Sequence, residues 1–251
     1  MLNKILEVKR EEISRLTLPE REGEPCVPFA DSLKKGGSAG LIAEVKKASP
    51  SKGVIREDFD PVAIAEAYEA GGARAISVLT DQTFFQGNPE YLTAIKQHVS
   101  LPVMRKDFII DSLQVQESRR LGADAILLIG EALDVGQLKK LYDEAHSLGM
   151  EVLVEVHALK TLHDILDVFT PAVLGINNRD LNTFHTSLTH TAAIAESVPE
   201  NSFLVSESGI YTSEHVAEVK KAGAGAVLVG ESLMRQSNVE EAVRELLKEE
   251  R

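Results

Sequence analysis

Lysine, glutamate and amide side chains stand at the ends of five short apolar runs of this sequence, and such side chains can move protons. They are Glu44, Lys46, Lys106, Glu155, Asn177 and Glu207. Burying two lysines and three glutamates costs several kcal/mol per ion unless the charges are well paired. A structural ion pair would explain one lysine–glutamate pair equally well, but it does not explain five strand ends. We therefore predict a proton-transfer site, with lysine as acid or electrostatic anchor and glutamate as acid or base.

Other site chemistries fit these residues poorly. The run ends hold no cluster of histidine, aspartate and cysteine, and the interleaved lysines would repel a divalent metal. A Gly-x-Ser-x-Gly nucleophile turn is absent. We interpret four histidines as helix or loop residues and not as metal ligands: His157, His163, His185 and His190. The sequence predicts neither a metal nor a cofactor.

Two glycine-containing turns follow the last two apolar runs and are candidates for holding a phosphate group. They are Ser208-Gly209 and Gly230-Glu231-Ser232. Glycine lets the backbone approach an anion closely, and free N–H groups at a helix start point toward it. Of Glu231 we expect only the backbone N–H to contribute. The alternative is that these glycines only make the turns between helices and strands.

A polar segment at residues 49–53 follows the first apolar run. It is either a flexible surface loop or a lid that brings Ser49 or Lys52 to the phosphate.

Eight apolar runs must position these residues, and they recur about every 20 to 35 residues, as βα units require. The runs are Leu41–Val45, Ala75–Leu79, Pro102–Met104, Ala125–Ile129, Val152–Val154, Val173–Ile176, Phe203–Val205 and Ala226–Val229. Their continuous apolar character indicates parallel strands that are buried on both faces. Eight units without a Gly-x-Gly-x-x-Gly turn favour a closed (β/α)8 TIM barrel over a doubly wound open sheet. In such a barrel the active site lies at the C-terminal ends of the strands.

Helix boundaries can also be predicted between these runs. Asp60, Asp111 and Asp134 are expected to cap helices at their N-termini, as is Thr212 or Ser213. Each of the four predicted helices is followed by glycine, which is typical of the return to the next strand.

Length and charge limit the class of protein. The 251 residues fit one (β/α)8-barrel catalytic domain, 1–251, in which about residues 1–38 form an N-terminal extension. We expect an amphipathic helix over Met1–Leu16 and an irregular lead-in over residues 17–38. The net charge of −12 argues against a nucleic-acid partner. With no signal peptide, no apolar run of about 20 residues and one cysteine, Cys26, we expect a cytoplasmic protein that does not enter a membrane.

Several segments together resemble the indole-3-glycerol-phosphate synthase family of tryptophan biosynthesis. They are Ile42–Ser51, Lys106–Ile109, Glu155–His157, Gly175–Leu181, Ser206–Ile210 and Val229–Met234. The resemblance runs in order from about residue 29 to the end of the chain, and only the first 30 or so residues match loosely. It implies the phosphorylated substrate 1-(2-carboxyphenylamino)-1-deoxyribulose 5-phosphate. It is also compatible with weak association with other tryptophan-pathway enzymes.

The resemblance also implies roles for the catalytic residues. Lys106 resembles the general acid that protonates the sugar carbonyl oxygen, and Lys46 the lysine near the substrate carboxylate. Glu155 resembles the acid or base of the dehydration and rearomatisation steps. Which lysine acts at which step stays open.

Further residues match the family's supporting and binding positions. Glu44 and Asn177 resemble the pair that orients the substrate hydroxyl and the lysine, with Glu207 as electrostatic support. The implied binding residues are Ser49, Arg179, Ser208, Gly209, Gly230 and Glu231 around the phosphate, and Phe85, Phe108, Leu127 and Leu181 as walls for the anthranilate ring.

Three rival functions share part of this pattern. A phosphosugar isomerase would share the phosphate site, but it usually depends on an acid/base pair rather than two lysines with two glutamates. A Schiff-base aldolase would use Lys106 as a nucleophile. A non-catalytic phosphometabolite-binding barrel would bind phosphate without forming an indole product.

Overall fold

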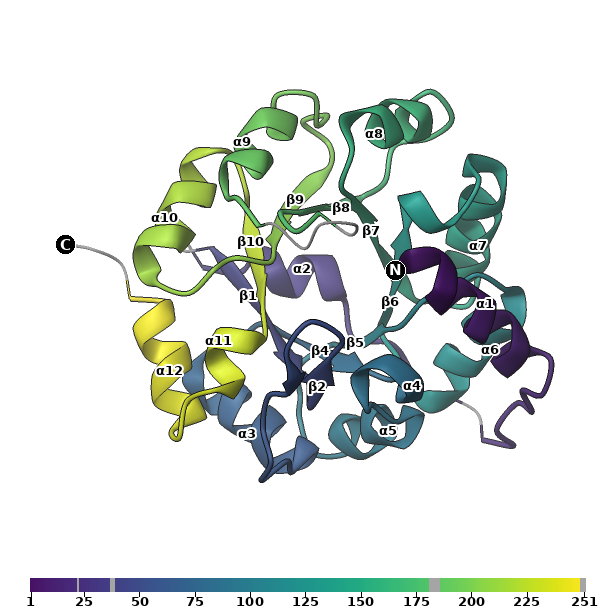
Figure 1. The fold of residues 1–251 in the computed structure, drawn as a ribbon, viewed down its shortest axis with the longest axis horizontal. Coiled ribbons are helices and arrows are strands. Elements are labelled where there is room, and N and C mark those ends of the chain that lie inside the picture. Colours follow the sequence, from purple (N-terminus) through teal and green to yellow (C-terminus); the bar gives the residue numbers. More distant parts are fainter. Residues whose placement is uncertain (22, 37–38, 181–185, 249–251) are drawn as a thin grey trace.

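Eight parallel strands close into a barrel in the computed structural model, which describes residues 1–21, 23–36, 39–180 and 186–248 (Figure 1). The strands are β1 Gly40–Val45, β4 Ala75–Leu79, β5 Val103–Lys106, β6 Ala125–Ile129, β7 Glu151–Val156, β8 Val173–Asn177, β9 Phe203–Glu207 and β10 Ala226–Val229. Each pairs with its neighbours in chain order, and β1 closes the barrel against both β4 and β10. The predicted TIM barrel is confirmed, and the doubly wound open sheet is excluded.

Helices surround this barrel (Figure 1). The outer helices are α3 Pro61–Gly71, α5 Pro89–Lys96, α6 Ser112–Leu121, α7 Val135–Ser147, α8 Leu159–Leu166, α9 Thr189–Ala195, α10 Ser213–Lys221 and α12 Val239–Leu246. Shorter or additional elements are α1 Leu2–Ile13, α2 Phe29–Lys34, α4 Gln82–Phe85, the 3₁₀ helix η1 Gly130–Ala132, α11 Glu231–Met234 and the hairpin of β2 Ala48–Ser49 with β3 Gly53–Val54. In the part of the chain described, no helix has both the length and the apolar character needed to cross a bilayer.

The predicted helix caps are confirmed. The Asp60, Asp111, Asp134 and Thr212 side chains each accept a hydrogen bond from a backbone N–H in the first turn of the following helix. Such caps satisfy donors that have no partner within the helix. They fix the residue at which each helix begins. They therefore also fix the path of the loops beside the site.

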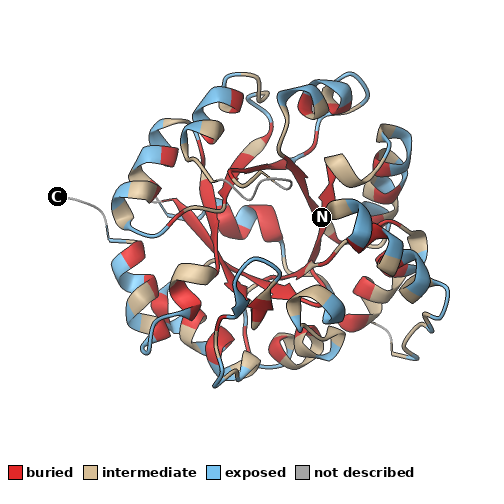
Figure 2. Ribbon diagram, in the orientation of Figure 1, coloured by how far each residue is buried: buried red, intermediate tan, exposed pale blue. Residues whose placement is uncertain are grey.

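Strand alternation separates two apolar cores and aims the polar side chains. Ile42 belongs to the core inside the barrel, whereas its neighbours Leu41 and Ala43 pack in the larger core between strands and helices. Since alternate residues of a strand face the same side, Glu44 continues the interior face of β1. Figure 2 shows the strands buried along most of their length, which agrees with their continuous apolar sequence.

The expectation of an irregular lead-in over residues 17–38 is wrong for the segment that forms α2. Phe29 and Leu33 of this helix are fully buried in the interior core of the barrel. Glu151, at the start of β7, accepts a hydrogen bond of 3.1 Å from the Ala30 N–H. Six residues are too few to show a helical period, so burial against the barrel decides this helix. Helix α1 also ends earlier than predicted, at Ile13 rather than Leu16.

We predict that Phe29→Ala lowers the free energy of unfolding by about 3–5 kcal/mol, because the ring leaves a cavity in the barrel core. Urea unfolding followed by circular dichroism measures this change. Leu113→Ala, at an exposed position of α6, is the control and should change stability by less than about 0.5 kcal/mol. A loss below about 1 kcal/mol for Phe29→Ala would contradict a stabilising role of α2.

Candidate active site

The predicted residues meet at one pocket at the C-terminal ends of the strands. Those that line it are Glu44, Lys46, Ser49, Phe85, Lys106, Phe108, Leu127, Glu155, Asn177, Arg179, Glu207, Ser208, Gly209, Gly230 and Glu231. Leu181, the remaining predicted wall residue, lies outside the described residues. The structure therefore brings these side chains together, while the roles given to them stay predictions.

A lysine shared by two carboxylates forms the centre of the pocket. Lys106 Nζ at the end of β5 lies 2.9 Å from Glu155 Oε2 and 3.0 Å from Glu207 Oε2. The two glutamates come from β7 and β9, and both are at least 97% buried. Asn177, on the strand between them, donates a 3.0 Å hydrogen bond to Glu155 Oε1.

Burial and these contacts move the pKa values of the three groups apart. Burial lowers the pKa of Lys106, but Glu155, Glu207 and Glu44 outweigh it, so this pKa lies above its ordinary value. Burial raises the pKa of Glu207 to about 8; Lys106 opposes the shift and Glu155 adds to it. Burial also acts to raise the pKa of Glu155, but Lys106 and the Asn177 amide lower it below its ordinary value. Near neutral pH the cluster thus holds an ammonium acid, a carboxylate base and a neutral carboxylic acid.

A second lysine–glutamate pair lies on β1 and just beyond it. The Lys46 ammonium is paired with the Glu44 carboxylate, and both line the same pocket as Lys106. Glu44 is 4% exposed, and its charge also acts to raise the pKa of Lys106. The site therefore contains two ammonium groups, each neutralised by buried glutamates.

The rim formed after β9 and β10 has backbone geometry suited to an anion. Ser208 and Gly209 have positive φ angles of 68° and 80°, and α11 begins directly after Gly230. The Glu231 carboxylate turns toward cations, 3.1 Å from the Arg235 guanidinium and 3.8 Å from that of Arg179. This arrangement fits the expectation that Glu231 contributes its main chain rather than its carboxylate.

The segment at residues 49–53 is a hairpin. Its β2 and β3 strands pair at Ala48 with Val54 and at Ser49 with Gly53, and Ile55 N–H donates to Lys47 O at 2.8 Å. Ser49 lines the pocket, whereas Lys52 Nζ lies 3.9 Å from Glu231. The hairpin thus forms part of the pocket edge.

Two aromatic rings line the pocket near α4 and the end of β5. The centroids of Phe85 and Phe108 lie 6.1 Å apart with the rings tilted by 38°. Together with Leu127 they provide an apolar surface beside the charged cluster, which suits a flat ring.

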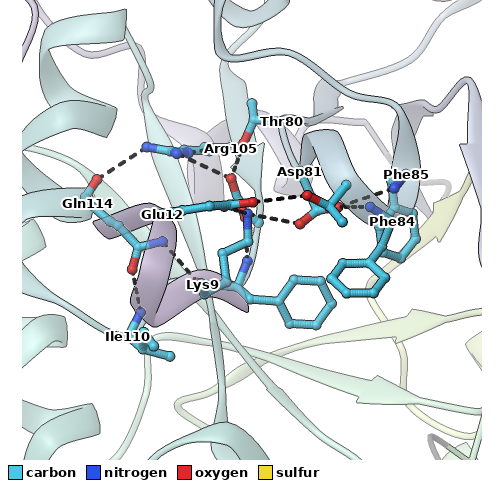
Figure 3. A network of polar contacts seen from close by, with 12 residues as sticks. Lys9, Glu12, Thr80, Asp81, Phe84, Phe85, Arg105, Ile110 and Gln114 are labelled. Carbon is cyan, nitrogen blue, oxygen red and sulfur yellow. Dashed lines mark hydrogen bonds and ion pairs between the residues drawn. The ribbon is translucent and has the colours of Figure 1, made fainter. Parts of the chain in front are cut away.

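Helix α1 adds a buried lysine that the sequence did not reveal. Lys9 Nζ lies 2.7 Å from Glu12 and 2.8 Å from Asp81 (Figure 3), and it lies 2.9 Å from Asp107. Burial lowers the pKa of Lys9, but Asp107 and Asp81 reverse the effect and raise it. On an amphipathic helix Lys9 looks like any solvated lysine, so only the folded chain shows its role.

The carboxylates around Lys9 hold the two aromatic walls. Asp81 accepts hydrogen bonds from the Phe85 N–H at 3.1 Å and from the preceding N–H (Figure 3). Asp107 accepts one from the Phe108 N–H at 2.8 Å, and it directly follows Lys106 in the chain. Burial acts to raise the pKa of Asp107, yet Arg105 and Lys9 lower it to about 2. Lys9 thus links α1 to both rings, and Leu2 and Ile5 of the same helix line the pocket.

The histidines beside the pocket take structural contacts. His157 Nδ1 lies 2.8 Å from the Asn177 carbonyl, and the His157 ring stacks on that of His190 at 4.4 Å. Among the residues that the structure describes, no three histidine, cysteine, aspartate or glutamate side chains lie together as metal ligands would.

Comparison with known proteins places this geometry in a family. The family model described as "Indole-3-glycerol phosphate synthase" matches residues 2–246. The chain belongs to this family. A relative from Priestia megaterium with that name is 59% identical over 250 residues, covering 99% of this chain and 98% of the relative. One from Geobacillus thermodenitrificans is 60% identical over 252 residues, covering 100% of this chain and 98% of the relative.

Solved structures of other proteins share the fold at much lower identity. Thiamine phosphate pyrophosphorylase from Pyrococcus furiosus matches with a TM-score of 0.61 at 18% identity, over 86% of this chain and 95% of that one. The N-acetylmannosamine-6-phosphate 2-epimerase from Clostridium perfringens matches with a TM-score of 0.62 at 15% identity, over 84% of this chain and 93% of that one. These two similarities establish the barrel alone.

We predict that Lys9→Met lowers the free energy of unfolding by about 3–5 kcal/mol, because it leaves buried carboxylates without their cation. Urea unfolding measures the loss, and trypsin should cleave faster within α1. Lys4→Met, at an exposed position of the same helix, is the control. Equal stability of the two variants would show that the Lys9 ion pairs contribute nothing.

The raised pKa of Glu207 also predicts a pH dependence of stability. A carboxyl whose pKa rises from 4.5 to about 8 on folding binds more protons in the folded state between these values. The free energy of unfolding should therefore fall as the pH rises through this interval. Glu207→Gln should remove most of this slope in urea unfolding at a series of pH values, and Glu66→Gln on exposed α3 surface should retain it. A slope that survives in Glu207→Gln would mean that Glu207 is not the group that titrates.

Proposed function

We propose that the chain converts 1-(2-carboxyphenylamino)-1-deoxyribulose 5-phosphate to indole-3-glycerol phosphate, CO2 and water. The observation that carries this proposal is the Lys106 ammonium between the Glu155 and Glu207 carboxyl groups, beside two aromatic rings. Family membership favours it over the isomerase, the aldolase and the non-catalytic barrel. We further propose a single catalytic domain in the cytoplasm without a nucleic-acid partner; association with other tryptophan-pathway enzymes stays a prediction.

Each step of the reaction can be assigned to groups of this chain. The anthranilate ring carbon that bears the carboxylate attacks the sugar carbonyl carbon, and Lys106 gives the carbonyl oxygen its proton. The C–CO2⁻ bond then breaks, and its electron pair restores the aromatic ring. The new hydroxyl leaves as water with a proton from a lysine ammonium, and Glu155 accepts the proton lost from the ring that forms. Because these steps need positioned acids and bases in a sheltered site, no cofactor is proposed.

The remaining residues hold the substrate in this geometry. We assign the substrate carboxylate to Lys46, whose charge Glu44 balances, and the orientation of Glu155 to Asn177. Glu207 supports the charge of Lys106. We assign the phosphate to the backbone of Ser208, Gly209, Gly230 and Glu231 with Ser49 and Arg179 beside it, and the anthranilate ring to Phe85, Phe108, Leu127 and Leu181.

We predict that Lys106→Ala and Glu155→Gln each lower kcat by about 10²–10⁴-fold, or about 3–5 kcal/mol of barrier, because each removes a proton-transfer group. The assay mixes pure protein with the anthranilate-ribulose phosphate and follows indole fluorescence. Lys139→Ala on the outer helix α7 is the control and should retain the parent rate. Near-normal turnover of Lys106→Ala would refute its role, and trapping of substrate by borohydride would indicate an aldolase instead.

A further inference from the structure

One position on the interior face of the barrel carries no side chain, and it lies beside the central carboxylates. Val173 of β8 packs in the interior core, and Asn177 of the same strand lines the pocket. Gly175 lies between them on the same face by strand alternation. It pairs in register with Glu155 of β7 on one side and with Val205 of β9 on the other.

The space over this glycine is filled by the Glu207 carboxyl group. A Cβ atom on Gly175 would overlap Glu207 Oε1 and would lie 3.2 Å from Leu153 Cδ1. The Glu207 Oε1 atom is buried and receives no N–H or O–H from the other described residues. The nearby Glu155 carboxylate acts to raise the pKa of Glu207. Glu207 therefore leans across β8, over the position where a side chain would stand.

The backbone does not explain why residue 175 is a glycine. Its φ angle lies outside the left-handed region that favours glycine, so alanine would fit the local conformation. Glycine in a strand also weakens the strand, because it has more freedom to lose and no side chain to pack. The remaining reason is space for a neighbour.

A second glycine of the barrel makes room for a second glutamate. A Cβ atom on Gly230 would lie 2.5 Å from Glu44 Oε1 and 3.0 Å from Glu44 Cβ. Two buried carboxylates of this site thus lie over positions without a side chain, one on β8 and one directly after β10.

We propose that Gly175 is a positioning residue of the reaction: its missing side chain lets Glu207 reach across β8 to Lys106 and Glu155. This inference rests on the proposed function, since it concerns the groups assigned to proton transfer. The charged groups that act on Glu207 are Lys106 from β5 and Glu155 from β7. Asn177 of β8 is its partner in strand register, and Glu44 of β1 lines the same pocket and acts on Lys106.

Gly175→Ala tests the proposal. The overlap falls on the far end of a side chain that can shift, so the variant should fold, but the Glu207 carboxyl must move toward the pocket and water. We expect kcat to fall about 10–100-fold, as a displacement near 1 Å can cause. KM should change less than about threefold, because substrate contacts are retained. Urea unfolding checks that the fold is kept.

Two second-site variants separate the Glu207 overlap from simple crowding. Glu207→Asp shortens the side chain by one methylene. As a single variant it should lower kcat below that of the parent, whereas the double variant with Gly175→Ala should have a higher kcat than Gly175→Ala itself. Leu153→Val relieves only the apolar contact and should leave kcat of Gly175→Ala low. Recovery with Leu153→Val instead of Glu207→Asp would overturn the proposal, as would parent-like kcat in Gly175→Ala.

An infrared titration of the protonated carboxyl band provides a readout that needs no turnover. The parent should show a carboxyl that stays protonated near neutral pH, and Glu207→Gln should remove it. In Gly175→Ala the midpoint should move down by about one pH unit or more, because Glu207 gains water and moves away from Glu155. An unchanged midpoint would refute the positioning role. If Glu207→Gln turns over like the parent, the catalytic role of Glu207 fails and with it the role of Gly175 in the reaction, while the infrared result still shows whether Gly175 sets the position of Glu207.

Discussion

The arrangement of the site depends on one ammonium group held between two buried carboxyl groups. Lys106 could not be buried alone, and neither could Glu155 or Glu207, since each charge would lose its hydration without compensation. Two carboxyl groups facing one cation cannot both be charged without repulsion. One proton therefore stays on the pair near neutral pH, and the same contacts that stabilise the cluster supply an acid and a base.

The barrel provides the rigidity that this cluster needs. Lys106, Glu155 and Glu207 stand on three separate strands, so their distances are set by strand register and not by a flexible loop. Helix α2 closes the interior core near the strand beginnings, and α1 fixes the opposite end through Lys9 and its aspartates. The aromatic rings of the pocket are held by those same aspartates, so the extension before the barrel helps to shape the pocket.

Much of this could be predicted from the sequence because the information is local. Continuous apolar runs show buried parallel strands, Asp60 or Asp111 shows a helix start, and Glu44 with Lys46 shows a polar strand end. The missed features depend on distant contacts. Lys9 looks solvated until Asp81 and Asp107 surround it, and the helix at Phe29 is too short to show a period. Gly175 looks like an ordinary strand residue until Glu207 is seen over it.

The most direct measurement is a crystal structure with a substrate analogue in which the sugar carbonyl is an alcohol. The account predicts Lys106 Nζ within about 2.7–3.2 Å of that alcohol oxygen. The phosphate should lie against the backbone that follows β9 and β10. The aromatic ring should lie in the space lined by Phe85, Phe108 and Leu127. An analogue bound with its alcohol oxygen remote from Lys106, or with its phosphate elsewhere, would contradict the account.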